Sequence, residues 1–296
     1  MSQDDIEIFD RKLVRQRRNR SAALWQDHNF LHAEIADRTA DRVHDINRQF
    51  DRALHMGAHA QGIADCLPNI DFIHTNLSEK RLHALDGSRV VCDDELLAFD
   101  DESFDLVISN LSLHSVNDLP GALIQIRRIL KPDGLFLASM FGGDTLHEFR
   151  QAMMKAELDT LQGSSPRVAP TADVRDMGSL LQRAGFVMPV TDIDTITVSY
   201  DNPFKLMHDL RGMGESNVVN KRLKRPTKRS TFMRMAEIYA KDHADADGRI
   251  PATFQVIYLS GWSPGPNQPV PKRPGSATKS LAEALGTTEQ KTGDKV

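Results

Sequence analysis

The sequence predicts an α/β protein in which helices cover a seven-stranded, mostly parallel sheet. From Phe50 onward, short apolar runs alternate with segments of helical periodicity, which is typical of that architecture. The chain has 296 residues, of which 40% are hydrophobic, so it is long enough to bury one large core. The two cysteines, Cys66 and Cys92, form no CxxC pair and have no histidine pair at metal-ligand spacing. We therefore expect neither a disulfide framework nor a zinc site.

The N-terminal region, residues 1–48, is expected to form a basic arm followed by a helix. Residues 11–20 (RKLVRQRRNR) hold six basic side chains. After them, apolar residues between Leu24 and Val43 recur at roughly helical spacing. We favour a solvated run of charge for the arm over a surface that contacts an acidic partner.

The main domain is expected to span residues 49–262. Its predicted strands are residues 52–57, 72–75, 89–92, 104–110, 135–141, 190–200 and 253–262. A periodic helix over 119–130 should end at the turn Lys131 to Gly134, and a second helix is expected over 145–161. Residues 202–247 are largely helical and are predicted to form a cap between the last two strands. The tail, 263–296, is rich in Pro, Gly, Thr and Lys and is expected to be disordered.

The charge balance argues against a general affinity for nucleic acid. The chain carries 37 Lys and Arg against 41 Asp and Glu, a formal net charge of -4. Its basic segments lack interleaved aromatic residues on which bases would stack.

No run approaches the roughly 20 apolar residues that span a bilayer. The acidic first residues do not resemble a transit peptide. We expect a cytoplasmic bacterial protein, with the mitochondrial matrix less favoured.

Three strand ends carry the pattern of a nucleotide-type cofactor site. Residues 53–62 (ALHMGAHAQG) run from the first strand into the turn after it, where a glycine lets the backbone approach a ligand. Asn76 stands after the second strand, where a carboxylate would accept hydrogen bonds from ribose hydroxyls. Asp93 follows the third strand, where an acid can receive an adenine amino group. Two structural alternatives stay open: Gly57 suits any tight strand-to-helix turn, and acidic turns are common on surfaces.

The fourth and fifth strand ends point to a substrate pocket. The fourth strand runs through Phe104–Asn110 and brings Asn110 and Leu111 to the same edge of the sheet. His114, a few residues later, either faces the pocket or caps a helix. Gly142, Gly143 and Asp144 form either a flexible turn with Asp144 as helix N-cap, or part of the substrate edge.

Segments spread along nearly the whole chain resemble the assembly factor 5 family of respiratory complex I. They are residues 104–120 (FDLVISNLSLHSVNDLP), 130–134 (LKPDG), 140–146 (MFGGDTL), 209–217 (DLRGMGESN) and 251–255 (PATFQ), together with 8–11 (IFDR), 40–46 (ADRVHDI) and 275–278 (GSAT). The generic methyltransferase pattern alone would also fit a biotin-pathway carboxyl methyltransferase. The combination of segments favours the assembly factor family.

The resemblance implies a class I methyltransferase fold, kinship with S-adenosylmethionine (SAM) enzymes, and a protein partner. In the mitochondrial member the attributed activity is hydroxylation of an arginine in the iron–sulfur subunit beside the quinone site. Carried over by position, Gly57 matches the first glycine of the family's cofactor loop. Asp93 matches its strand-three acid, and Asn110 and Leu111 match the strand-four tip.

The same edge departs from the family pattern. His55 replaces an acidic residue before the loop, His59 and Gln61 replace two loop glycines, and Asn76 replaces the ribose acid. If His59 took a positive φ, the strain would cost about 1–3 kcal/mol. Losing the charge-assisted bond at Asn76 would cost about 1–2 kcal/mol.

Two functions therefore remain in view. The first is a SAM-dependent enzyme that modifies a protein side chain, with the cofactor at His55, Gly57, Asn76, Asp93, Asn110 and Leu111. Its substrate would lie over His114, Gly142, Gly143 and Asp144. The second is a non-catalytic assembly chaperone that has lost SAM binding. No catalytic residue stands out, and we expect no metal, because His55 and His59 are poorly spaced and no facial-triad spacing is visible.

Overall fold

A seven-stranded sheet forms the centre of the protein, with strand order β3-β2-β1-β4-β5-β7-β6. The computed structural model describes residues 7–59, 62–266, 268–269, 276 and 280–288. The β1–β2, β2–β3, β1–β4 and β4–β5 pairings are parallel, and β7 is antiparallel to both β5 and β6. The predicted class I methyltransferase sheet is therefore confirmed.

The strands are β1 (Arg52–Met56), β2 (Asp71–Asn76), β3 (Ser88–Val91), β4 (Phe104–Asn110), β5 (Leu130–Phe141), β6 (Val187–Tyr200) and β7 (Ile250–Trp262). The helices are α1 (Arg11–Ser21), η2 (Ala22–Leu24), α2 (Trp25–His28), α3 (Phe30–His44), α4 (Ile63–Cys66), α5 (Glu79–Leu82), η3 (Leu113–Ser115), α6 (Leu119–Ile129), α7 (His147–Leu161), α8 (Val174–Arg183), α9 (Pro203–Met213), α10 (Arg229–His243) and α11 (Leu281–Ala284).

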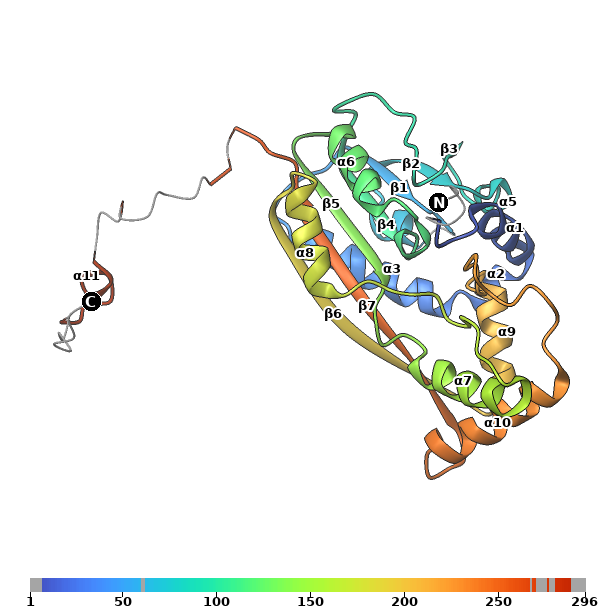
Figure 1. The fold of residues 1–296 in the computed structure, drawn as a ribbon. Coiled ribbons are helices and arrows are strands. Elements are labelled where there is room, and N and C mark those ends of the chain that lie inside the picture. The colour runs from blue at the N-terminus through green and yellow to red at the C-terminus, as the bar shows by residue number, and fades with distance from the viewer. Residues whose placement is uncertain (1–6, 60–61, 267, 270–275, 277–279, 289–296) are drawn as a thin grey trace.

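Helices cover both faces of the sheet (Figure 1). On one face, α6 packs on β5 and α8 packs on β6 and β7, and they bury apolar side chains that include Leu123 and Leu181. On the other face, α3 contributes Ala36, Ala40 and Val43 to a second cluster. A third cluster joins α7, α9 and α10 to the long strand β7. The apolar periodicity of each helix matches the face that it buries.

Along the chain, α9 and α10 come after β6 and before β7, which is the segment that the sequence predicts to form a cap. The division of the chain into an arm with helix (1–48), a main domain (49–262) with a cap, and a tail stays a prediction. Much of the tail 263–296 lies outside the described residues.

One local expectation is wrong. The helix expected over 119–130 is present as α6 and ends at Ile129, but the predicted turn at Lys131 to Gly134 lies inside β5. There the register against β4 shifts between Phe104 and Leu106, and Asp133 takes a φ of 62°. A bulge thus absorbs the Pro-Asp-Gly segment, because the preceding Leu130 already pairs with Phe104.

Candidate functional site

The loop after β1 begins at Gly57, where any other residue would strain the backbone and clash with a neighbour. Gly57 has a φ of 62°, and a Cβ added to it would lie 2.1 Å from the Cβ of Ser112. His59 is not among the described residues with positive φ, so the strain expected there does not arise. Gln61 lies outside the described residues.

Asn76, at the end of β2, is fully buried and already satisfied within the protein. Its Nδ2 donates to the carbonyl of Ala58 at 2.7 Å, and its Oδ1 accepts from the backbone N–H of Ser78 at 2.8 Å. The amide therefore holds the two loops together in the position where the sequence places a ribose acceptor.

The basic N-terminal segment is a helix, and two of its arginines contact the acids after β3. Arg11 pairs with Asp93 and lies 3.4 Å from Glu95. Arg18 is only 3% exposed and lies 3.8 Å from the buried Asp94. The interpretation of residues 11–20 as a solvated run is therefore wrong for Arg11 and Arg18. Their partners come from more than 70 positions away, which no local pattern records.

Side chains from α2 and α5 fill the space above the glycine loop. The Trp25 ring stacks on His59, with ring centroids 4.8 Å apart, and the Arg81 guanidinium lies 3.7 Å from the Trp25 ring centroid. Arg81 is 1% exposed and donates to Ser21 Oγ at 2.6 Å and to the Met213 carbonyl at 2.9 Å. The arrangement is a packed cation–π stack in a desolvated setting.

A cavity of about 40 Å³ lies beside this stack, and buried histidines are among the described residues that line it. His32, His55 and His59 each keep at least one ring nitrogen without a hydrogen-bond partner among the described residues. Burial lowers the pKa of His32 and of His55 to about 3. His55 also lies 3.2 Å from His74, measured between their Nδ1 atoms. These imidazoles are therefore neutral at physiological pH.

The tip of β4 is an ordered, buried turn. Asn110 donates to the His32 carbonyl at 3.1 Å and accepts from Ser139 Oγ at 2.9 Å. Leu111 takes a φ of 49° and is fully buried. The structure thus brings together at one edge of the sheet the residues His55, Gly57, Asn76, Asp93, Asn110 and Leu111. The polar side chains of Asn76, Asp93 and Asn110 form hydrogen bonds or ion pairs with other groups of the protein.

A larger cavity, of about 310 Å³, lies beside this edge between β5, the N-terminal helix and α9. Its walls are mainly apolar and include Phe9, Phe141, Phe149, Phe232 and Phe254. Of the predicted substrate residues, His114 lines the cavity. Its Nε2 lies 3.0 Å from Glu215 Oε2, so the pocket-facing alternative describes its position.

Glu215 is the one acidic residue among the described residues that line this cavity. Its side chain retains 16% exposure, and His32 Nε2 lies 3.9 Å away. Burial opposes its ionisation, but the attraction of His114, His32 and Arg18 outweighs burial and lowers the pKa of Glu215 to about 2. Glu215 lies in the segment 209–217, but the sequence predicts no role for it. Its partners, His114 and His32, are about 100 or more positions away in the chain, so no local pattern indicates them.

The turn Gly142 to Asp144 does not line this cavity. A Cβ on Gly142 would lie 2.6 Å from Gln255 Oε1, so this glycine permits the close approach of β7. Asp144 is exposed and accepts from Gln255 Nε2 at 3.2 Å. It is not the N-cap of α7, because that position belongs to Leu146, which has a φ of 54°. The neighbouring Thr145 and Leu146 line the cavity instead.

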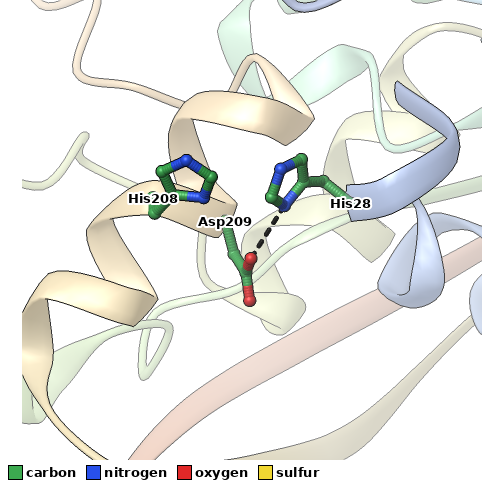
Figure 2. A group of neighbouring side chains, drawn as sticks. All are labelled: His28, His208 and Asp209. Atoms are coloured by element: carbon green, nitrogen blue, oxygen red, sulfur yellow. Dashed lines mark hydrogen bonds and ion pairs between the residues drawn. The ribbon is translucent and has the colours of Figure 1, made fainter. Parts of the chain in front are cut away.

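A separate group of potential metal ligands lies where α2 packs on α9. Figure 2 shows His28, His208 and Asp209 facing one another. One ligand atom from each lies within 4.8 Å of the others. His28 Nδ1 is 2.8 Å from Asp209 Oδ1. Sequence reasoning missed this group because His28 is 181 positions from Asp209.

The amino-acid sequence of the chain is similar to those of known methyltransferases and their relatives. A methyltransferase domain model matches residues 52–138. The mitochondrial arginine-hydroxylase NDUFAF5 of Homo sapiens is 42% identical over 288 residues, which cover 94% of this chain and 83% of that protein. This chain belongs to the NDUFAF5 arginine-hydroxylase family.

The wider relationships of this NDUFAF5-family chain agree with its sheet topology. The malonyl-[acyl-carrier protein] O-methyltransferase of Halorhodospira halophila is 32% identical, covering 90% of this chain and 92% of that protein. The crystal structure of the YcgJ protein from Bacillus subtilis superposes with a TM-score of 0.55 at 13% identity. The match covers 77% of this chain and 99% of that one, and it supports the fold alone.

Within the described part of the chain, no helix combines the length and the apolar character needed to cross a membrane.

Proposed function

We propose that this chain is a methyltransferase-fold assembly factor of the complex I type, which binds a protein side chain of a complex I subunit in the 310 Å³ cavity. Family membership supports the class of function. By resemblance, the proposed partner is the iron–sulfur subunit of complex I. The name of the human relative identifies arginine as the side chain on which that protein acts.

The observation that carries the proposal is the ionised Glu215 at the wall of an apolar cavity. A guanidinium group recognises a carboxylate through charge-assisted hydrogen bonds, while the methylene stem of arginine prefers apolar contacts. Phenylalanine rings such as Phe141 and Phe254 supply those contacts. Three of the four arginines that also line the cavity have other partners: Arg18 faces Asp94, Arg167 pairs with Glu157, and Arg17 donates to the Asn217 carbonyl. The fourth, Arg211, is exposed to solvent. Glu215, whose Oε2 lies 3.0 Å from His114 Nε2, is the acidic group among the described lining residues that a cationic guest would meet.

The cofactor that a methyltransferase domain implies is SAM, and the residues present do not fit it. A pocket for a ligand of that size usually spans about 300–1,000 Å³. Among the described residues, a cavity of about 40 Å³ lies at the loop after β1, where Trp25, His59 and Arg81 pack against one another. Asn76 has both ends of its amide engaged by Ala58 and Ser78. This filled edge motivates the second candidate function, a chaperone that binds its partner without SAM. The methyltransferase domain model and the relatives support the first, a SAM-dependent methyltransferase-like assembly factor.

Complementation tests the assembly role. Deletion of the gene is expected to reduce fully assembled complex I on a native gel, and the unaltered gene to restore it. Glu215→Gln keeps the shape of the side chain without its charge and is expected not to restore assembly. The control Glu237→Gln removes an exposed acid on α10 and should behave like the unaltered gene. Normal assembly in the deletion strain would overturn the function, and restoration by Glu215→Gln would overturn the role of that residue.

Calorimetric titration with SAM separates the two candidates. We expect no binding by the unaltered protein, and binding by a variant that combines His59→Gly with Asn76→Asp and Trp25→Ala. Binding to the unaltered protein with micromolar affinity would show that the filled edge opens, and would support the SAM-dependent enzyme.

A further inference from the structure

The group formed by His28, His208 and Asp209 lies outside the large cavity and outside the cofactor edge. It comes from two elements that are far apart in the sequence, α2 and α9, and Figure 2 shows the two imidazole rings and the carboxylate around one shared space. The His28 and His208 ring centroids are 4.9 Å apart. Among the described residues these three are the ones whose donor atoms gather closely enough for one ion.

The position of His28 is fixed by packing. Its side chain is 9% exposed, and a Cβ on Gly212 would lie 2.1 Å from His28 Cδ2. A glycine is therefore required at that point of α9 for the His28 ring to fit between the helices. His208 is exposed and Asp209 half-buried, so an ion would reach the group from solvent. A rigid ligand beside two accessible ones favours ion binding, because little ordering is needed.

The distances suit a metal ion after small side-chain movements. Around a tetrahedral ion with ligand bonds of about 2.1 Å, donor atoms lie roughly 3.4 Å apart. His28 Nδ1 and Asp209 Oδ1 are 2.8 Å apart, a hydrogen-bond distance that would widen when both bind an ion, and the three ligand atoms all lie within 4.8 Å of one another. The exposed side chain of His208 would turn toward the other two ligands. Two imidazoles and one carboxylate form the ligand set of facial-triad sites and, as two His and one Glu, of catalytic zinc sites.

We propose that His28, His208 and Asp209 bind one divalent first-row transition-metal ion. This proposal differs from the sequence-based expectation, which is that there is no metal site. It would cross-link α2 to α9, whose opposite side contributes Met207 and Leu210 to the wall of the large cavity. Binding of the ion to the folded state alone would then raise the melting temperature. The site stands on its own contacts and does not depend on the proposed function.

Metal titration of the full chain, freed of metal with a chelator and carrying no polyhistidine tag, tests the site. Zn²⁺ and, under anaerobic conditions, Fe²⁺ are the probes, and Mg²⁺ is the control for non-specific carboxylate binding. We expect one Zn²⁺ or Fe²⁺ per chain and a higher melting temperature. Loss of an outer-shell partner typically weakens metal binding 10–100-fold, so His208→Ala and Asp209→Asn, which remove direct ligands, should each weaken binding at least about tenfold.

The control variant His83→Ala removes an exposed histidine on another face and should bind as the unaltered protein does. Because His208 is exposed, His208→Ala leaves the fold intact, and its circular dichroism spectrum should match that of the unaltered chain. Absence of saturable binding, equal binding of Mg²⁺, or unchanged affinity in both ligand variants would overturn the proposal.

Discussion

At the scale of single residues, the strand-end residues lie where a cofactor site is expected, but their side chains and backbone contact other parts of the protein. Gly57 serves close packing against Ser112, and Asn76 ties the loops after β1 and β2 together. Both residues stand where a cofactor loop would need them. Their present contacts are nevertheless within the protein, so they contribute to the stability of the fold.

Replacing Gly57 with alanine tests how much of that stability depends on close approach. Gly57 and Gly248 both have positive φ, at 62° and 75°. A left-handed backbone costs an L-residue about 1–2 kcal/mol, which both alanine variants incur. Gly248→Ala should lose only that amount, since nothing lies within 4 Å of its new Cβ. Gly57→Ala should lose at least about 1–3 kcal/mol more, because Ser112 must move.

Urea denaturation of both variants measures the difference. Equal losses of unfolding free energy for Gly57→Ala and Gly248→Ala would show that Ser112 yields easily and that the turn is not tightly packed.

At the scale of elements, α1 acts as a cover for the acidic turn after β3. Its residue spacing turns Val14 and Arg18 inward, while Arg15 and Arg20 remain exposed. Arg18 lies against Asp94, which also accepts a hydrogen bond from Ser112 at 3.3 Å. The helix is therefore part of the packed molecule, and its charges do not form a free basic surface.

Arg18→Met is expected to destabilise the protein by about 1–3 kcal/mol, because the buried Asp94 would lose one of its two cationic partners and keep Arg11. Arg15→Met changes the same residue type on the exposed side of the same helix, and should change stability by less than about 0.5 kcal/mol. Thermal unfolding followed by circular dichroism distinguishes the two. A loss at Arg18 no greater than that at Arg15 would contradict the proposed role of this contact.

At the scale of the whole molecule, buried histidines make stability depend on pH. His32 and His55 have a pKa of about 3 in the folded state and about 6.5 when unfolded. Between these values the unfolded chain binds more protons, so stability rises with pH and is lost as pH falls below 6.5. Glu215, whose pKa is lowered to about 2, adds to the loss at lower pH in the same direction.

We expect the unfolding free energy to fall by about 1–3 kcal/mol between pH 7.5 and pH 5.5. Burial also lowers the pKa of His59, so His55→Asn removes one of at least three such groups and should reduce the fall by roughly a third. The exposed His83→Ala variant should leave it unchanged. Urea denaturation at the two pH values gives the numbers, and a pH-independent unfolding free energy in the unaltered protein would refute the expectation.

The sequence by itself determined the sheet, because apolar periodicity and turn residues are local properties. It placed every strand within a few residues and brought Gly57, Asn76, Asp93 and Asn110 to one edge. Only the tertiary structure decided what covers that edge. Trp25 and Arg81 meet there from separate helices, and Glu215 joins His114 and His32 at the cavity. Such contacts join residues tens to nearly two hundred positions apart, and chain folding creates them without leaving a local pattern.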